Sequence, residues 1–292
     1  MKTQLLLFPI AAALFYALSV IFAKIASKKG SVSPTSMLAA TNLAIMFVFL
    51  PFVFLSSDID FTHIWRPAVV GLFFALGNYA TFLCAKYVQV SLMTPIMGVK
   101  ILFVFATASA LSGILPSAEV FLSGVICAIA VFIMGYDKEL LSGSSKIGKT
   151  LALALSTCFF YAVCDVLVQQ LSGKYSPCVF LGLTSVFLAI SSAPAVPKMF
   201  REFLSGGKTT LIAVLSAAFM ATESTLMFIA LANNLDAGLC NIVYNIRGVM
   251  SVVLVYFMSG AYPELEHLSR SSAGRRLLGS FMILGAIALV VF

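Results

Sequence analysis

Charged side chains are scarce in this sequence of 292 residues. Only 10% of the residues are Asp, Glu, Lys or Arg, whereas 61% are hydrophobic. A soluble domain carries about 25% charged residues, and its core cannot absorb this much apolar surface. The composition therefore excludes an ordinary soluble domain and predicts an integral, multi-pass membrane protein.

The formal net charge of +7 does not indicate a nucleic-acid partner. The Lys and Arg residues cluster between apolar runs, where they act as orientation signals and contact lipid headgroups. We therefore expect the partners to be the lipid bilayer and a small-molecule substrate, with no nucleic acid.

Motifs of enzymes are missing. The two histidines, His63 and His267, fall in predicted loops, and the sequence has no HExxH, phosphate-binding glycine loop or nucleophile elbow. None of the six cysteines forms a CxxC pair, so we interpret them as small core residues. We expect no enzyme activity, catalytic residue, metal or cofactor. An ion channel would need a repeated filter or a charged ring, and neither is visible.

Long apolar runs dominate the sequence. They predict an all-α membrane protein, because only helices and closed barrels satisfy their backbone hydrogen bonds in lipid. The first run begins close to Lys2 and is expected to be an uncleaved anchor. Ser33-Pro34 and Ser176-Pro177 each open a predicted span. The ten predicted transmembrane helices cover approximately residues 4–25, 34–55, 67–86, 89–111, 117–135, 149–171, 177–197, 209–231, 237–259 and 276–292.

The chain repeats itself. Phe15-Tyr16-Ala17 recurs as Phe160-Tyr161-Ala162 at a shift of 145 positions. We interpret residues 1–143 and 144–292 as two repeats of five helices each. Because five is odd, the second repeat must be inverted relative to the first. Inverted repeats are typical of alternating-access carriers, whose substrate site lies near the midplane where the halves meet.

Two basic residues lie deep within predicted spans. When Gln89–Gly113 is aligned with Asp236–Gly260 at a shift of 147 positions, Lys100 falls on Arg247. An isolated charge inside a membrane costs a few kcal/mol or more and usually faces a cavity or a partner. Two bases at matched depth in the two halves are the strongest functional signal in the sequence.

The ninth predicted span carries a polar stripe around Arg247. With helical spacings of i, i+4, i+7 and i+11, the stripe consists of Cys240, Tyr244, Arg247 and Ser251. Asn241 and Asn245 lie on the adjoining face. The planar guanidinium binds carboxylate or phosphate bidentately, and Lys100 would add an ammonium from the other half. Alternatively, Arg247 and Lys100 are structural ions paired with acids on other helices.

Two acids are candidate partners for these bases. Asp165 lies in the sixth span with Tyr161 at i−4 and Gln169 at i+4, and Glu223 lies deep in the eighth span. Each acid is a candidate ion-pair partner, ligand for a substrate amine, or proton carrier. Burial and a nearby cation shift the pKa of a carboxyl in opposite directions, so the sequence leaves the choice open.

Weaker candidates complete the predicted cavity. They are Asn42, Asn78 and Tyr79, together with the repeat-related Tyr16 and Tyr161. Such side chains more often bond to a neighbouring helix than to a ligand. The predicted substrate-binding residues are Arg247, Lys100, Tyr244, Asn241, Asn245, Asn78, Tyr16 and Tyr161, and the predicted coupling or ion-pair residues are Glu223 and Asp165.

The chain resembles the drug/metabolite transporter superfamily, and its EamA-like ten-helix carriers in particular. The resemblance rests on FYALSVIFAKIASKKGSVSP, its copy FFYAVCDVLVQQLSGKYSP, and SLMTPIMGVKILFVFATASALSG, and it covers nearly the whole chain. Related phosphate translocators also use basic residues on their fourth and ninth helices, which supports an anionic group on the substrate. Many such carriers have a Gly-Glu pair after these helices, where this sequence has Gly113-Ile114 and Gly260-Ala261.

We therefore expect a secondary active transporter of a small polar metabolite, an amino acid or other organic anion, with the proton as the candidate coupling ion. The resemblance implies alternating access. We expect a monomer in a bacterial inner membrane. One alternative is an exporter of cationic or aromatic, drug-like compounds. An alternative of another class is a non-transporting membrane assembly or lipid-binding protein.

Charge asymmetry predicts the orientation of the protein in the membrane. Lys2, Arg66 and Lys174 fall on the side of the N-terminus. Twelve basic residues fall on the opposite side: Lys28, Lys29, Lys86, Lys138, Lys146, Lys149, Lys198, Arg201, Lys208, Arg270, Arg275 and Arg276. The positive-inside rule then places both termini outside the cytoplasm, whereas the resemblance implies cytoplasmic termini.

We predict that a reporter enzyme that works only outside the cytoplasm is active when it is fused after Phe292. The reason is that the basic loops are retained in the cytoplasm, which places the C-terminus on the other side. Paired fusions to a reporter that works only outside and one that works only inside measure this. Activity of the inside reporter alone would show that the charge rule fails for this chain.

Overall fold

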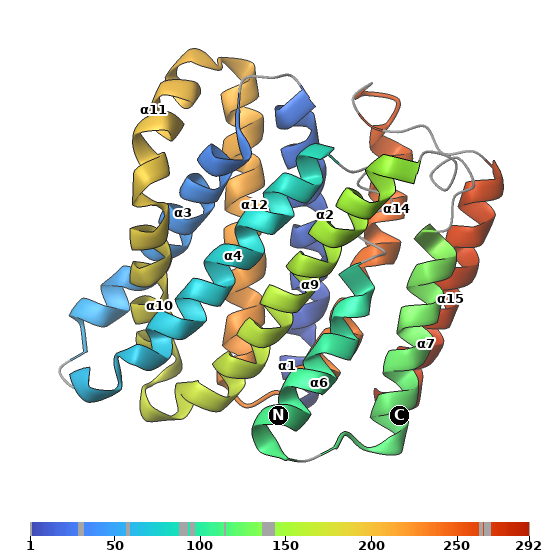
Figure 1. Ribbon diagram of the computed structural model, residues 1–292, viewed down its shortest axis with the longest axis horizontal. Helices are drawn as coiled ribbons and strands as arrows, with labels where there is room; N and C mark the ends of the chain where they lie inside the picture. Colours follow the sequence, from blue (N-terminus) through green and yellow to red (C-terminus); the bar gives the residue numbers. More distant parts are fainter. Residues whose placement is uncertain are drawn as a thin grey trace.

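The computed structural model describes residues 2–28, 32–56, 59–87, 93, 97–113, 115–135, 144–262, 265 and 270–291. Within these ranges every regular element is a helix, and Figure 1 shows them as a bundle. In chain order they are α1 (Lys2–Leu5), α2 (Leu7–Lys28), α3 (Pro34–Phe54), η1 (Phe61–His63), α4 (Trp65–Tyr87), η2 (Met97–Val99), α6 (Lys100–Ser112), α7 (Ala118–Gly135), α9 (Ser144–Leu171), η3 (Ser172–Lys174), α10 (Pro177–Ser192), η4 (Ala193–Ala195), α11 (Val196–Ser205), α12 (Lys208–Ala232), α13 (Ala237–Tyr244), α14 (Arg247–Met258) and α15 (Arg270–Val291).

The protein is a multi-pass membrane protein. Among the described residues, seven helical segments are long and apolar enough to cross a membrane, and Met97–Ser112 and Ala118–Ala130 are shorter apolar helices. The predicted starts of two spans are confirmed, because α3 begins at Pro34 and α10 at Pro177. Proline suits the first helical position, where its missing N–H leaves no bond unmade. The predicted boundary between the halves, at residue 143, lies outside the described residues.

The ninth predicted span, residues 237–259, is not one continuous helix. It is divided into α13 and α14, which meet at a tight turn. In this turn the N–H of Asn245 donates to the carbonyl of Ile242 at 3.2 Å, and the N–H of Ile246 donates to that of Val243 at 3.2 Å. These i to i+3 bonds belong to a 3₁₀ geometry, which often marks a hinge or strained stretch. The fourth predicted span also contains a 3₁₀ turn, because η2 comes directly before α6.

Helices of the first predicted half pack against helices of the second. α2 packs against α12, α4 against α9, α3 against α10, and α7 against α15. In Figure 1 both termini lie at the same end of the bundle; α2 runs away from this end and α9 runs towards it. Ser19 and Ser216 join α2 to α12, since each hydroxyl donates to the other residue's carbonyl, at 2.8 and 2.9 Å. One apolar core therefore includes residues from both predicted halves.

Gly71 shows how closely α4 and α10 approach. A Cβ atom at Gly71 would lie 2.9 Å from the Cβ of Phe187 and 3.1 Å from the carbonyl oxygen of Thr184. Neither atom lies at the end of a flexible side chain, so relief of the contact would need a movement of the helices.

We predict that Gly71→Ala lowers the melting temperature of the purified protein, because overpacking costs about 1–3 kcal/mol. Gly274→Ala in α15 is the matched control, since nothing lies within 4 Å of the added Cβ there. Equal melting temperatures for the two variants would contradict the close packing of α4 on α10.

Candidate functional site

Four charged side chains meet inside the bundle. Lys100 on α6, Asp165 on α9, Glu223 on α12 and Arg247 on α14 are all buried, with 2% to 8% of their surface exposed. Together they line a cavity of about 20 Å³, which has room for about one water molecule. The structure therefore brings together both predicted bases and both predicted acids, although they lie far apart in the sequence.

Lys100 and Asp165 form a buried ion pair. The Nζ atom of Lys100 lies 2.6 Å from Oδ2 of Asp165, and Nδ2 of Asn241 donates to the same oxygen at 2.8 Å. The ammonium also lies 5.5 Å from the ring centre of Tyr161 and 5.6 Å from that of Tyr244, within range of cation–π attraction. The charge of Lys100 is thus compensated by an acid. This agrees with the alternative in which Lys100 is a structural ion paired with an acid on another helix.

Arg247 is held differently. Its Nη2 atom donates to the carbonyl oxygen of Met97 at 2.8 Å, and its guanidinium carbon lies 4.3 Å and 4.9 Å from the ring centres of Tyr244 and Tyr16. Its Nε atom is buried and has no hydrogen-bond partner. Among the described residues no carboxylate lies at ion-pair distance from this guanidinium. Arg247 therefore has no directly paired carboxylate in the described chain and keeps a vacant donor beside the cavity.

Glu223 is bound by hydroxyl groups. The Tyr244 hydroxyl donates to Oε1 at 2.5 Å, and the Ser224 hydroxyl donates to Oε2 at 2.9 Å. Within the described part of the chain, no Lys or Arg lies at ion-pair distance from this carboxyl. Tyr244 thus stands between these two charged groups, with its ring against Arg247 and its hydroxyl on Glu223.

The amide candidates mostly join helices. The Tyr161 hydroxyl donates to Oδ1 of Asn78 at 2.6 Å, Asn78 donates to Oδ1 of Asn42 at 3.0 Å, and Asn42 donates to the carbonyl of Leu188 at 3.3 Å. This chain of bonds runs across α9, α4, α3 and α10. Asn78 lies behind the Tyr161 ring and does not line the cavity, and Tyr79 is 39% exposed on the outside of α4.

Tyr16 and Asn245 support the turn that precedes Lys100. The Tyr16 hydroxyl donates to the sulfur of Met97, and Nδ2 of Asn245 donates to the carbonyl of Gly98 at 3.5 Å. Lys100 is the first residue of α6 and Arg247 the first residue of α14. A cation at a helix N-terminus is opposed by the helix dipole, so each base favours a neighbouring anion.

A larger vestibule adjoins this ion cluster. It has a volume of about 360 Å³ and is lined by residues of α6, α9 and α13 and of the α6–α7 connection. Its lining residues Val104, Gln169 and Ala237 lie one helical turn from Lys100, Asp165 and Asn241, respectively. One turn is about 5.4 Å, so Lys100, Asp165 and Asn241 lie about that far along their helices from the residues that line the vestibule.

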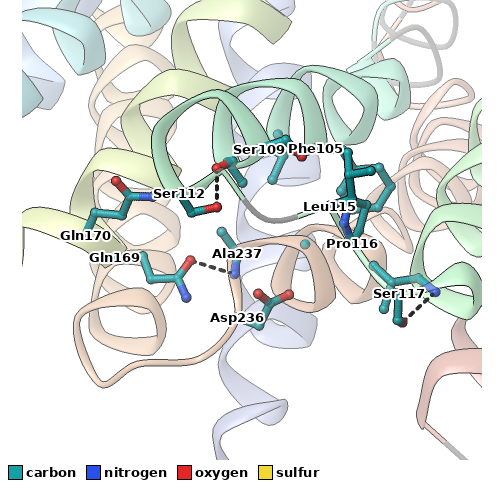
Figure 2. A pocket seen from close by; sticks show the side chains of 14 residues that line it. Phe105, Ser109, Ser112, Leu115, Pro116, Ser117, Gln169, Gln170, Asp236 and Ala237 are labelled. Atoms are coloured by element: carbon teal, nitrogen blue, oxygen red, sulfur yellow. Dashed lines mark hydrogen bonds between the residues drawn. The ribbon is translucent and has the colours of Figure 1, made fainter.

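Figure 2 shows how the vestibule wall is built. The side chain of Gln169 accepts a hydrogen bond from the backbone N–H of Ala237 at 3.1 Å, which fixes the start of α13 against α9. Asp236 caps the same helix by accepting from the N–H of Leu239 at 2.8 Å. The α6–α7 connection, which contributes Pro116 and Ser117, lies at the end of the bundle that holds both termini (Figure 1).

Sequence reasoning missed several contributors. The carbonyl of Met97 is free to bind Arg247 because of the turn before α6, and a backbone acceptor leaves no mark in the side-chain pattern. Ser224 is adjacent to Glu223 in the sequence, but serine in an apolar helix is too common to signal a site. Phe74, Met227 and Phe228 complete the cavity wall and were indistinguishable from packing residues.

Comparisons with known proteins find a likeness in the fold alone. The sequence matches no family model and no curated protein. Twenty-seven chains of solved structures resemble it. One, described only as a crystal structure of a protein, aligns with a TM-score of 0.71 and 14% sequence identity, over 99% of this chain and 98% of its own. At this identity the likeness establishes a shared fold over the full length.

We predict that Asp165→Asn destabilises the protein by about 3–5 kcal/mol, because it leaves the ammonium of Lys100 buried without an anion. Glu223→Gln is the matched control: it also neutralises a buried carboxyl, but one that pairs with hydroxyl groups, so its cost is smaller. Thermal unfolding in detergent measures both. A larger loss in Glu223→Gln than in Asp165→Asn would contradict the assigned pairing.

Proposed function

We propose that the protein is a secondary active transporter of a small polar metabolite that carries a carboxylate, an amino acid or other organic anion. The observation that carries this proposal is Arg247, whose guanidinium is buried beside a small cavity with a vacant donor and no carboxylate partner in the described chain. A buried charge without a partner is costly, so such residues mark substrate or ion pathways. A substrate carboxylate would supply the missing anion.

The packing of the helices supports two inverted repeats with alternating access. If the halves are exchanged, the α2–α12 contact maps onto α9–α4, and the α6–α9 contact maps onto α14–α2. The α3–α10 and α7–α15 contacts map onto themselves. A pseudo-two-fold axis through the cavity accounts for all of these pairs. Together with the quoted sequence patterns, this arrangement supports membership of the EamA-like carriers of the drug/metabolite transporter superfamily.

The charges favour an anionic substrate over a cationic one. Asp165 is already compensated by Lys100 at 2.6 Å, so Glu223 is the acid that remains for a cationic group. Arg247, in contrast, can form a new pair without breaking an existing one. A lipid-binding or assembly protein has no use for four charges around a buried cavity, because contact with lipid requires none.

We predict that Arg247→Ala lowers substrate uptake about 10- to 100-fold, since a hydrogen bond to a charged group contributes about 1.5–3 kcal/mol. Arg247→Lys keeps the charge but loses the planar fork, so it also transports poorly. The measurement is uptake by lipid vesicles of a radiolabelled panel: glutamate, alanine, phenylalanine, succinate and the cation tetraphenylphosphonium. Arg201→Ala, which removes an exposed arginine of α11, is the control and retains uptake. Wild-type uptake of a carboxylate by Arg247→Ala would contradict the proposal, and selective uptake of tetraphenylphosphonium would favour the cation exporter.

A further inference from the structure

The two buried carboxyl groups beside the cavity differ in the chemistry of their partners. Both line the cavity, Asp165 from α9 and Glu223 from α12. From this difference we propose that Glu223 is the group that binds and releases a proton, and that Asp165 stays ionised as the fixed counter-ion of Lys100. The role of the proton in transport rests on the proposed function, whereas the site of protonation does not.

One oxygen of Asp165 is bound by two groups that can only donate. Its Oδ2 atom accepts from the ammonium of Lys100 and from the amide nitrogen of Asn241. Neither an ammonium nor an amide N–H₂ can accept a hydrogen bond. A proton added to this oxygen would therefore displace one of these donors and leave the charge of Lys100 uncompensated. The geometry therefore favours Glu223 over Asp165 as the group that takes up a proton.

Glu223 is surrounded by groups that can both donate and accept. When it is ionised, its two oxygens accept from the hydroxyls of Tyr244 and Ser224. When a proton from water adds to Oε2, the new O–H can donate to Ser224, whose hydroxyl rotates and still has lone pairs. Oε1 continues to accept from Tyr244. Both protonation states of Glu223 thus keep their hydrogen bonds.

The other titratable groups around Glu223 determine what its protonation changes. Those that face it or interact with it electrostatically, from α2, α6, α9, α13 and α14, are Tyr16, Lys100, Tyr161, Cys164, Asp165, Cys240, Tyr244 and Arg247. Of the remaining helices against α12, α3 carries no titratable side chain, α10 carries Cys178, and α11 carries Lys198, Arg201 and Glu202.

Protonation of Glu223 changes the charge balance of the cavity. With both acids ionised, the two negative charges compensate those of Lys100 and Arg247. With Glu223 neutral, the positive charge of Arg247 is left over, and an anion in the cavity restores the balance. A proton on Glu223 and a carboxylate on Arg247 therefore favour each other's binding, and this coupling is reciprocal. It makes the protein a symporter of protons and anions.

The protonation site is tested by infrared difference spectra of the protein in lipid membranes, recorded between acidic and alkaline pH without any substrate. We expect a carbonyl band of a buried, protonated carboxyl that is present in the wild type, absent in Glu223→Gln, and shifted in Glu223→Asp. The band should remain in Asp165→Asn or, if that variant does not fold, in Lys100→Met/Asp165→Leu, which removes both charges. A band that remains in Glu223→Gln and vanishes with Asp165 would overturn the proposal.

Coupling is tested separately, in vesicles, with whichever carboxylate of the uptake panel the wild type transports. An imposed proton gradient should drive accumulation by the wild type and by the control Arg201→Ala, but not by Glu223→Gln. Proton-driven accumulation by Glu223→Gln would overturn the coupling. Failure of the wild type to transport any panel compound would count against the proposed function alone, because the infrared result stands without a substrate.

Discussion

The ion pair between Lys100 and Asp165 is the interaction on which the centre of this protein depends. It places two opposite charges 2.6 Å apart at the contact of α6 and α9, where water is largely excluded. Without Asp165, Lys100 would be a buried cation at the start of a helix, opposed by both desolvation and the helix dipole. Asn241 extends the pair to α13, so three helices that surround the vestibule are joined at one point.

The corresponding base of the second half has no such acid. Lys100 and Arg247 occupy matched positions in the sequence, and each follows a tight turn that interrupts a predicted span. The turn before α6 provides the Met97 carbonyl that Arg247 binds, but a neutral carbonyl does not cancel the charge. This asymmetry gives the cavity one stable ion pair and one arginine available to a substrate.

Much of the fold could be predicted from hydrophobicity, because apolar runs of membrane length have few alternatives in lipid. The starts at Pro34 and Pro177 followed from local chemistry. The division of α13 from α14 could not be predicted, because no proline or glycine stands between Tyr244 and Arg247 to mark the 3₁₀ turn. The high cost of intramembrane charge selected Lys100, Asp165, Glu223 and Arg247 as candidates. Which acid compensates which base depends on how α6, α9 and α12 pack. This packing could not be derived from the pattern of residues in the sequence.

The central claim is that Arg247 receives the carboxylate of the substrate. The most direct test is a structure of the protein determined with a transported carboxylate bound. The account predicts that the substrate carboxylate lies at hydrogen-bond distance from the Arg247 guanidinium, with the Lys100–Asp165 pair intact. The cavity lined by Glu223 and Tyr244 must then be wider than the 20 Å³ of the present structure. A substrate bound only in the vestibule, or a carboxylate bound to Lys100 in place of Asp165 with Arg247 still on the Met97 carbonyl, would contradict it.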